Sequence, residues 1–222
     1  MLRLNSALVA LAGAFTGSYA PFQAIHLQPH AGGVLVASSD HGRVSALAFD
    51  RQGRADESCD LLASSELLRS CSGIKSAERE LSLEGDTLTV TTYRKKAAHE
   101  VKTFPLQRAS APFPPLDQAV AACVRHWGAA PALSRTAGRY DSVYLEKALK
   151  AAGHLCDSLV LSSFDGGPLR LQSDTLELVI LVMPQTAAPI PPLPDWLERF
   201  AADASTPLPG SPPAACQGVQ SK

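Results

Sequence analysis

The sequence lacks the short motifs that mark most enzymes and metal sites. No Gly-x-Ser-x-Gly, phosphate loop, Gly-x-Gly-x-x-Gly or His-Glu-x-x-His occurs among its 222 residues. The run Ser39-Asp40-His41 names the three residue types of a hydrolase triad, but triads gather from distant positions, so we interpret it as a turn. The histidines and cysteines do not fall at ligand spacings. We therefore expect no enzyme activity, no catalytic residue, no metal site and no cofactor.

Three further absences concern charge, apolar runs and paired cysteines. The formal net charge is −1, so no global basic field indicates nucleic acid, and any DNA-binding surface has to be a local patch. No apolar run approaches the roughly 18 residues of a membrane-spanning helix. The five cysteines are odd in number, widely spaced and without a Cys-x-x-Cys pair. This pattern is typical of reduced thiols in a cytoplasmic protein.

The first 20 residues leave two interpretations open. Arg3, an apolar run over 7–15 and the small residues of 18–20 have the order of a secretory signal with its cleavage site. Alternatively, a short strand over 2–4 precedes a buried helix that begins at the N-cap Ser6 and ends near Phe15. The single positive charge and the unpaired cysteines favour the second interpretation.

The chain does have ample apolar content, 45%, which is enough for a large core. Alternation of apolar and polar residues predicts strands, and capping signals predict short helices. The expected strands of the first half lie at 22–27, 33–37, 43–49, 80–84, 87–92 and 99–104. The expected helices lie at 66–71, capped by Ser64 or Ser65, and at 116–127.

The stretch from Tyr140 to Gln185 carries the most specific pattern. Leu145, Ala148, Leu149 and Ala152 recur on one face of a helix predicted over 142–152, which Gly153 ends. Strands are expected at 158–162, 169–172 and 176–183, and Pro184 stops the last of them.

A change of composition follows Pro184. The segment 187–194 is rich in proline, 195–201 reads as a short amphipathic helix capped by Asp195, and 205–222 has the composition of a disordered tail. The apolar face of the short helix either docks on its own domain or binds a partner.

Two motifs resemble bacterial sliding clamps, the family of the DNA polymerase III beta subunit. The text Val36-Ala-Ser-Ser-Asp-His-Gly-Arg-Val-Ser-Ala46 is similar to the family's V-A-T-D-G-H-R-L-A, with His41 and Gly42 exchanged. That exchange puts the turn geometry in question, because glycine favours a positive φ. The text Leu181-Val-Met-Pro184 is similar to the start of V-M-P-M-R-L, whose last three residues are replaced here. Phe113-Pro114 resembles the F-P-D-Y that ends a clamp domain.

The resemblance implies an α+β protein with the DNA-clamp fold, in which antiparallel sheets carry helices on one face. Residues 1–114 would form one full clamp domain of two β-α-β-β-β halves. Residues 115–187 would form a shortened clamp-like domain, and 188–222 a proline-rich tail with its short helix. Such an abbreviated clamp is similar to chains of phage and prophage.

The function implied is that of a non-enzymatic, cytoplasmic processivity factor. It would encircle or contact duplex DNA without sequence specificity and tether a polymerase through a hydrophobic peptide-binding pocket. Its partners would be DNA and peptides of the polymerase and clamp loader, and a short chain that encircles DNA has to form a homo-oligomer. Two alternatives stay open: a monomeric clamp-derived adaptor or inhibitor of the polymerase or loader, and a secreted protein of unknown role.

The resemblance also names candidate residues for two surfaces. Cations on or near the expected helices would face DNA, although an ordinary solvated face explains them equally, and the first helix carries no lysine or arginine. These cations are Arg69, Lys75, Arg125, Lys147 and Lys150. The turn and the closing strand would form the peptide pocket, with plain core packing as the alternative. The pocket residues are Asp40, Arg43, Val44, Leu181, Val182, Met183 and Pro184.

Overall fold

The computed structural model of the chain describes residues 1–72, 77–115, 136–163, 167–173 and 175–189. Residues Met1–Pro189 form one compact body. The helices predicted at 116–127 and 195–201 lie outside the described residues, as does nearly all of the predicted tail. In the described ranges, no helix is long and apolar enough to cross a membrane.

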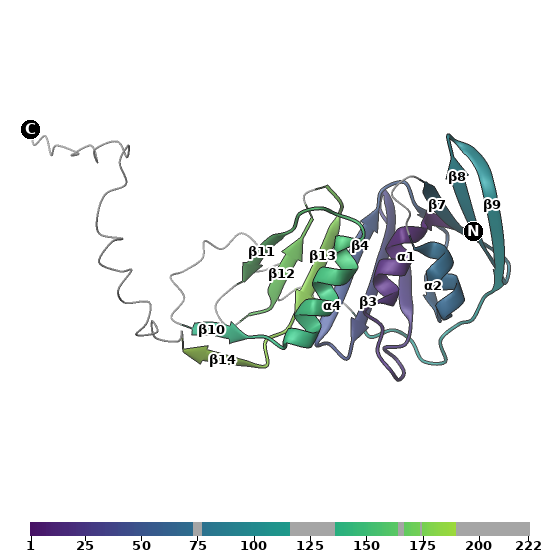
Figure 1. Ribbon diagram of the computed structural model, residues 1–222. Helices are drawn as coiled ribbons and strands as arrows, with labels where there is room; N and C mark the ends of the chain where they lie inside the picture. Colours follow the sequence, from purple (N-terminus) through teal and green to yellow (C-terminus); the bar gives the residue numbers. More distant parts are fainter. Residues whose placement is uncertain (73–76, 116–135, 164–166, 174, 190–222) are drawn as a thin grey trace, which may run out of the picture. The chain divides into compact units, whose positions relative to one another are not determined.

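In the described residues one motif occurs three times: a strand, a helix and a three-stranded antiparallel meander (Figure 1). Unit 1 comprises β1 (Leu2–Asn5), α1 (Ser6–Gly13), β2 (Ile25–His30), β3 (Gly33–Asp40) and β4 (Val44–Asp50). The short strand β5 (Arg54–Ala55) precedes unit 2, which comprises β6 (Cys59–Leu61), α2 (Ser65–Cys71), β7 (Glu78–Glu84), β8 (Thr87–Arg94) and β9 (Ala97–Pro105). Unit 3 comprises β10 (Thr136–Arg139), α4 (Ser142–Gly153), β11 (Val160–Ser163), β12 (Leu169–Gln172) and β13 (Leu178–Val182), and β14 (Thr186–Pro189) follows it.

Units 1 and 2 exchange their first strands. β1 of unit 1 pairs antiparallel with β7 of unit 2, and β6 of unit 2 pairs antiparallel with β2 of unit 1. The two helices lie side by side, α1 against α2 (Figure 1). Each first strand therefore extends the meander of the other unit, and each of the two units has the element order β-α-β-β-β.

Unit 3 joins unit 1 through a different edge. β13 pairs antiparallel with β4, in a register that sets Val182 opposite Val44. The result is a seven-stranded sheet in the order β11-β12-β13-β4-β3-β2-β6, beside a five-stranded sheet β5-β1-β7-β8-β9. This sheet runs across the predicted division between residues 1–114 and 115–187, and the division itself stays a prediction.

The core lies between the sheets and the helices that cover them. α1 is apolar on every side and has no exposed residue, which is typical of a helix buried within a core. Ile25 and Leu27 of β2 are fully buried, as the alternation of their strand requires. Ala148 and Ala152 bring α4 onto the same core.

Several local predictions need correction. The N-cap of α1 is Asn5, whose side chain accepts a hydrogen bond from the amide of Ala7 at 3.0 Å. The side chain of Ser6 instead donates to the carbonyl of Cys71 at 3.1 Å and so links α1 to α2. Leu149, predicted on the buried face of α4, is 49% exposed. The strand predicted to end at residue 27 runs on to His30, because the turn lies at Gly32, whose φ is +83°.

Candidate functional site

The turn between β3 and β4 consists of Asp40, His41, Gly42 and Arg43. Its two central residues both have positive φ, 51° at His41 and 72° at Gly42, and the Arg43 amide donates to the Asp40 carbonyl at 2.9 Å. This is the geometry of a tight hairpin whose twist matches its strands. Histidine is among the residues that tolerate the left-handed region, so the exchange of His41 and Gly42 leaves a regular turn.

Ser39 stabilises this turn. Its hydroxyl accepts a hydrogen bond from the Gly42 amide at 3.0 Å and shares another with the Ser45 hydroxyl at 2.8 Å. These contacts support the interpretation of Ser39-Asp40-His41 as a structural turn. No cluster of residues suited to a metal ion occurs in the described part of the chain.

The closing strand ends beside this turn. The register of β13 on β4 places Val182 opposite Val44, and the Met183 amide then donates to the Arg43 carbonyl at 2.8 Å. The structure thus brings together two motifs that are more than a hundred residues apart in sequence. Met183 is 45% exposed, whereas Leu181 is buried behind it.

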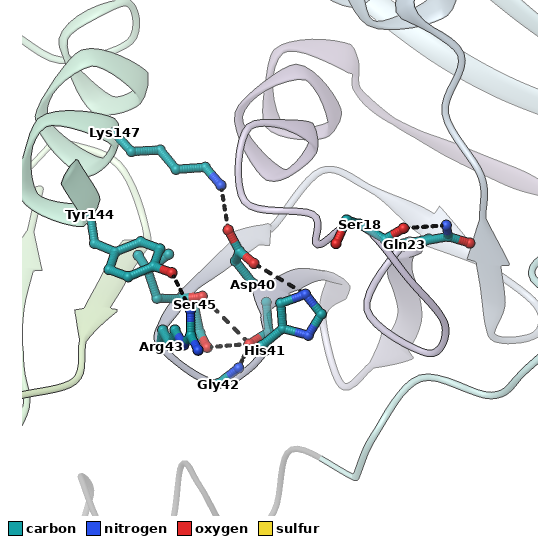
Figure 2. Close-up of polar contacts among 11 residues, drawn as sticks. Ser18, Gln23, Asp40, His41, Gly42, Arg43, Ser45, Tyr144 and Lys147 are labelled. Atoms are coloured by element: carbon teal, nitrogen blue, oxygen red, sulfur yellow. Dashed lines mark hydrogen bonds and ion pairs between the residues drawn. The ribbon is translucent and has the colours of Figure 1, made fainter. Parts of the chain in front are cut away.

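Two contacts bind α4 to the same turn. The Lys147 ammonium donates to Asp40 Oδ2 at 2.8 Å, and the Arg43 guanidinium donates to the Tyr144 hydroxyl at 3.0 Å (Figure 2). The Tyr144 hydroxyl raises the pKa of Arg43 above its ordinary value, because it accepts a hydrogen bond from the charged form. The side chains of Lys147 and Asp40 are 28% and 19% exposed, so this ion pair is partly shielded from water.

An open hollow of about 550 Å³ lies next to the turn. We call it the turn hollow, and it is lined by Thr16, Gly17, Ser18, Tyr19, Asp40, His41 and Arg43. Rings gather here: the centroid of His41 lies 4.0 Å from that of Tyr19 and 4.9 Å from that of Phe22. The hollow therefore offers an aromatic wall together with an exposed guanidinium and a carboxylate.

The predicted pocket residues divide into three groups. Asp40 and Arg43 line the turn hollow. Val44, Leu181 and Val182 are buried, and Val44 and Val182 pack in the core, so their part is to hold the turn and the strand together. Met183 and Pro184 follow directly after the paired strand, at its accessible end.

Sequence reasoning missed the segment from Thr16 to Tyr19 and the part of His41 in the hollow. Residues 18–20 have a recognisable pattern, a tyrosine between two small residues. From the sequence alone, this pattern fits a signal-peptide cleavage site as well as a pocket. His41 looks like a turn residue, and only the fold shows its ring packed against Tyr19.

The predicted DNA-facing cations lie in three settings. Arg69 is exposed on α2. Lys150 is exposed but pairs with Glu146 at 2.6 Å on its own helix, and Lys147 is held by Asp40. Lys75 and Arg125 lie outside the described residues.

Comparison with known proteins finds likeness at the level of structure. No family model matches the chain, and no curated protein matches it. A DNA polymerase sliding clamp from Pseudomonas aeruginosa is similar over 82% of this chain and 65% of its own, with 12% identity and a TM-score of 0.52. The DNA polymerase III beta subunit from Borrelia burgdorferi is similar over 83% of this chain and 64% of its own, with 9% identity and a TM-score of 0.51.

These two bacterial structures establish the fold. The chain has the sliding-clamp fold of antiparallel sheets with helices on one face, and it spans about two thirds of the length of those clamps. The predicted resemblance and the predicted fold class are confirmed. The pocket and the DNA-facing residues stay predictions.

Proposed function

We propose that the protein is a clamp-like processivity factor that tethers a polymerase through the turn hollow and contacts duplex DNA without sequence specificity. The observation that carries the proposal is the pairing of β13 with β4, which sets the end of the closing strand beside the β3–β4 turn. A clamp of this kind has no chemistry to perform. It raises the effective concentration of its partner at the template.

The chemistry of the turn hollow supports a peptide as its ligand. Tyr19 lines the hollow and is 61% exposed, and Met183, which is outside the lining but bonded to Arg43 of the turn, is 45% exposed. An apolar side chain of a linear peptide therefore has an aromatic and a flexible surface to cover. Arg43 keeps its charge and lies beside them, which suits the carboxylate or carbonyl groups of an extended peptide. Polymerase and clamp-loader peptides are the ligands that the clamp fold makes most plausible.

Peptide binding is tested with the full chain and a fluorescent clamp-binding peptide of a replicative polymerase. We expect Tyr19→Ala and Met183→Ala each to weaken binding about tenfold, which corresponds to about 1.4 kcal/mol. Val101→Ala is the matched control, because Val101 is equally exposed, at 58%, but lies on β9 away from the hollow. Unchanged affinity in both the Tyr19 and the Met183 variant would contradict the peptide pocket.

DNA contact is tested at the exposed cations of the helices. We expect a double variant Arg69→Glu and Lys150→Glu to reduce retention on circular DNA, with a shallower salt dependence because fewer phosphate contacts form. Lys147 is left unchanged in this variant, since its loss would also break the ion pair with Asp40. The same charge reversal at Arg94 on β8 serves as the control.

A second candidate function is a monomeric clamp-derived adaptor that binds the polymerase or loader without holding DNA. One observation favours it: α1 carries no charged side chain, and Lys147 is committed to Asp40, so few cations of the described helices are available to phosphates. Peptide binding that survives together with the absence of any DNA retention would favour the adaptor. Either role belongs to the cytoplasm.

A further inference from the structure

The three units of the chain are not equally complete. In units 1 and 2, the second strand of each unit is covered by the first strand of the other: β2 by β6, and β7 by β1. The second strand of unit 3 is β11, and it forms the edge of the seven-stranded sheet. Within the described residues, β11 has a partner on one side only, β12.

The first strand of unit 3 is incomplete in the same way. β1 lies between β5 and β7 in its sheet, paired on both sides. β10 pairs with β14 on one side, as β1 pairs with β5. On its other side, where β1 pairs with β7, β10 has no partner among the described strands. Unit 3 thus exposes both strand edges that a neighbouring unit covers elsewhere in this molecule.

Side-chain exposure agrees with the strand pairing. Leu27 of β2 and Leu81 of β7 are fully buried, whereas Val160 and Leu161 of β11 are each 55% exposed. The edge strand at the other end of the molecule is different, since β9 carries the ion pair of Glu100 with Lys102. Charges on an edge strand protect it from pairing, and β11 has none.

Among the described elements, no second helix packs beside the helix of unit 3. α1 and α2 approach so closely that a Cβ on Gly13 would lie 2.4 Å from Leu68 Cδ2. Counted from their N-caps, Leu149 of α4 has the position of Gly13 in α1, and Leu149 is 49% exposed. Lys147 of the same helix reaches Asp40 of unit 1. Leu149 is two residues further on, and positions two apart are separated by about 200° around a helix. Leu149 therefore lies on the flank of α4 that faces away from unit 1.

We propose that unit 3 is completed by unit 3 of a second copy of this chain, in a two-fold symmetric dimer. β10 of each copy covers β11 of the other, as β1 covers β7, and the two α4 helices pack together through Leu149, as α1 packs on α2. The approximate two-fold relation between units 1 and 2 becomes a true two-fold axis between copies. Such an isologous contact closes at two subunits. The proposal stands on strand pairing and does not depend on peptide or DNA binding.

The size of the assembly tests the dimer. Sedimentation equilibrium of the full chain over a range of concentrations is expected to give a reversible dimer, twice the chain mass of 23.4 kDa. Leu161→Lys should weaken self-association at least tenfold. Val101→Lys, an equally exposed change on the edge strand β9, should leave it unchanged.

A second pair of variants tests the helix contact. Leu149→Glu should weaken the dimer, whereas Val143→Glu, at a residue 65% exposed on the same helix, should not. Hydrogen exchange supplies a readout within the folded protein, because the β11 amides should gain protection as the concentration rises. Circular dichroism identifies any variant that has unfolded.

Three results would overturn the proposal. One is a monomer at every concentration up to roughly 100 μM, a very weak association. Another is an assembly that Val101→Lys dissociates and Leu161→Lys does not, which would mean head-to-tail contact through β9. The third is protection of the β11 amides at every concentration in a monomer, which would mean that the chain covers this edge itself.

Discussion

Units 1 and 2 differ from unit 3 in how their strand edges are covered, although all three have the same motif. Units 1 and 2 cover each other: they exchange first strands, their helices pack together, and their second strands are buried. Unit 3 gives its last strand to unit 1 and keeps its other edge uncovered within the described residues. The same fold therefore supplies a stable core where it is paired, and accessible edges where it is single.

The difference also concerns the β3–β4 turn. The turn hollow is lined by residues of unit 1 alone, and unit 3 reaches the same turn from beside it, through Lys147 on Asp40 and the Met183 amide on Arg43. The unpaired unit thus supports the turn that borders the hollow.

The largest effect is expected where a buried second strand is compared with the uncovered one. Leu27→Ala in β2 should lower the free energy of unfolding by about 2–5 kcal/mol at any protein concentration, because the cavity lies in the core. Leu161→Ala in β11 should cost less than about 0.5 kcal/mol in dilute protein. Urea unfolding of both variants measures the difference, and equal losses would mean that β11 is as well covered as β2.

The next effect concerns the packing of the helices. Gly13→Leu places a side chain where Leu68 already lies, so we expect a loss of about 1–3 kcal/mol through overpacking. Gly153→Leu at the end of α4 meets no described atom within 4 Å of its Cβ and should change dilute-protein stability by less than about 0.5 kcal/mol. Thermal unfolding at low concentration compares the two, and a large loss at Gly153 would show that α4 already has a neighbour.

A smaller, pH-dependent effect should appear in the paired helices. Burial raises the pKa of Cys71 from 9.0 to about 12. Between these values the unfolded chain has released the thiol proton and the folded chain still holds it. Stability therefore falls as the pH rises through this window, by about 1.4 kcal/mol at pH 10. Urea unfolding between pH 8 and pH 10 should show a shallower decline for Cys71→Ala than for the wild type; identical slopes would contradict the assignment.

Local pattern predicted much of this fold, and residues far apart in sequence account for what it missed. The hairpin of β7 and β8 and the helix of unit 3 follow from alternation, helical periodicity and a glycine at Gly85. β14 was not predicted, because it exists only through its pairing with β10. Lys147 was assigned to DNA from its helix position, and nothing local indicates a carboxylate more than a hundred residues earlier.

The candidate site was predictable to the same extent. The turn and the closing strand were identified separately, through two motifs, and the structure brings them together. Core packing was the stated alternative for the pocket residues, and Val44 and Val182 are buried in the core, whereas the contribution of Tyr19 to the hollow was not predicted. The place of the closing strand beside the turn depends on the register between β13 and β4, which single-sequence patterns do not encode.

The smallest effect concerns the ion pair that joins the single unit to the pair. Lys147→Met and Asp40→Asn, measured alone and together, should give a coupling energy of about 1 kcal/mol, since the pair is partly shielded. The pair of Glu146 with Lys150 within α4 is the control and should give a smaller coupling energy, because water screens its two exposed side chains.

The same variant also shows whether Lys147 acts on the β3–β4 turn or on DNA. If Lys147 serves the turn, Lys147→Met should also alter peptide affinity at the hollow, because Asp40 loses the partner that orients it. If Lys147 instead served DNA, the same change would reduce DNA retention and leave peptide affinity as it was. Peptide titration and DNA retention of the single variant therefore decide whether α4 acts as a lining for DNA or as a support for the turn beside the hollow.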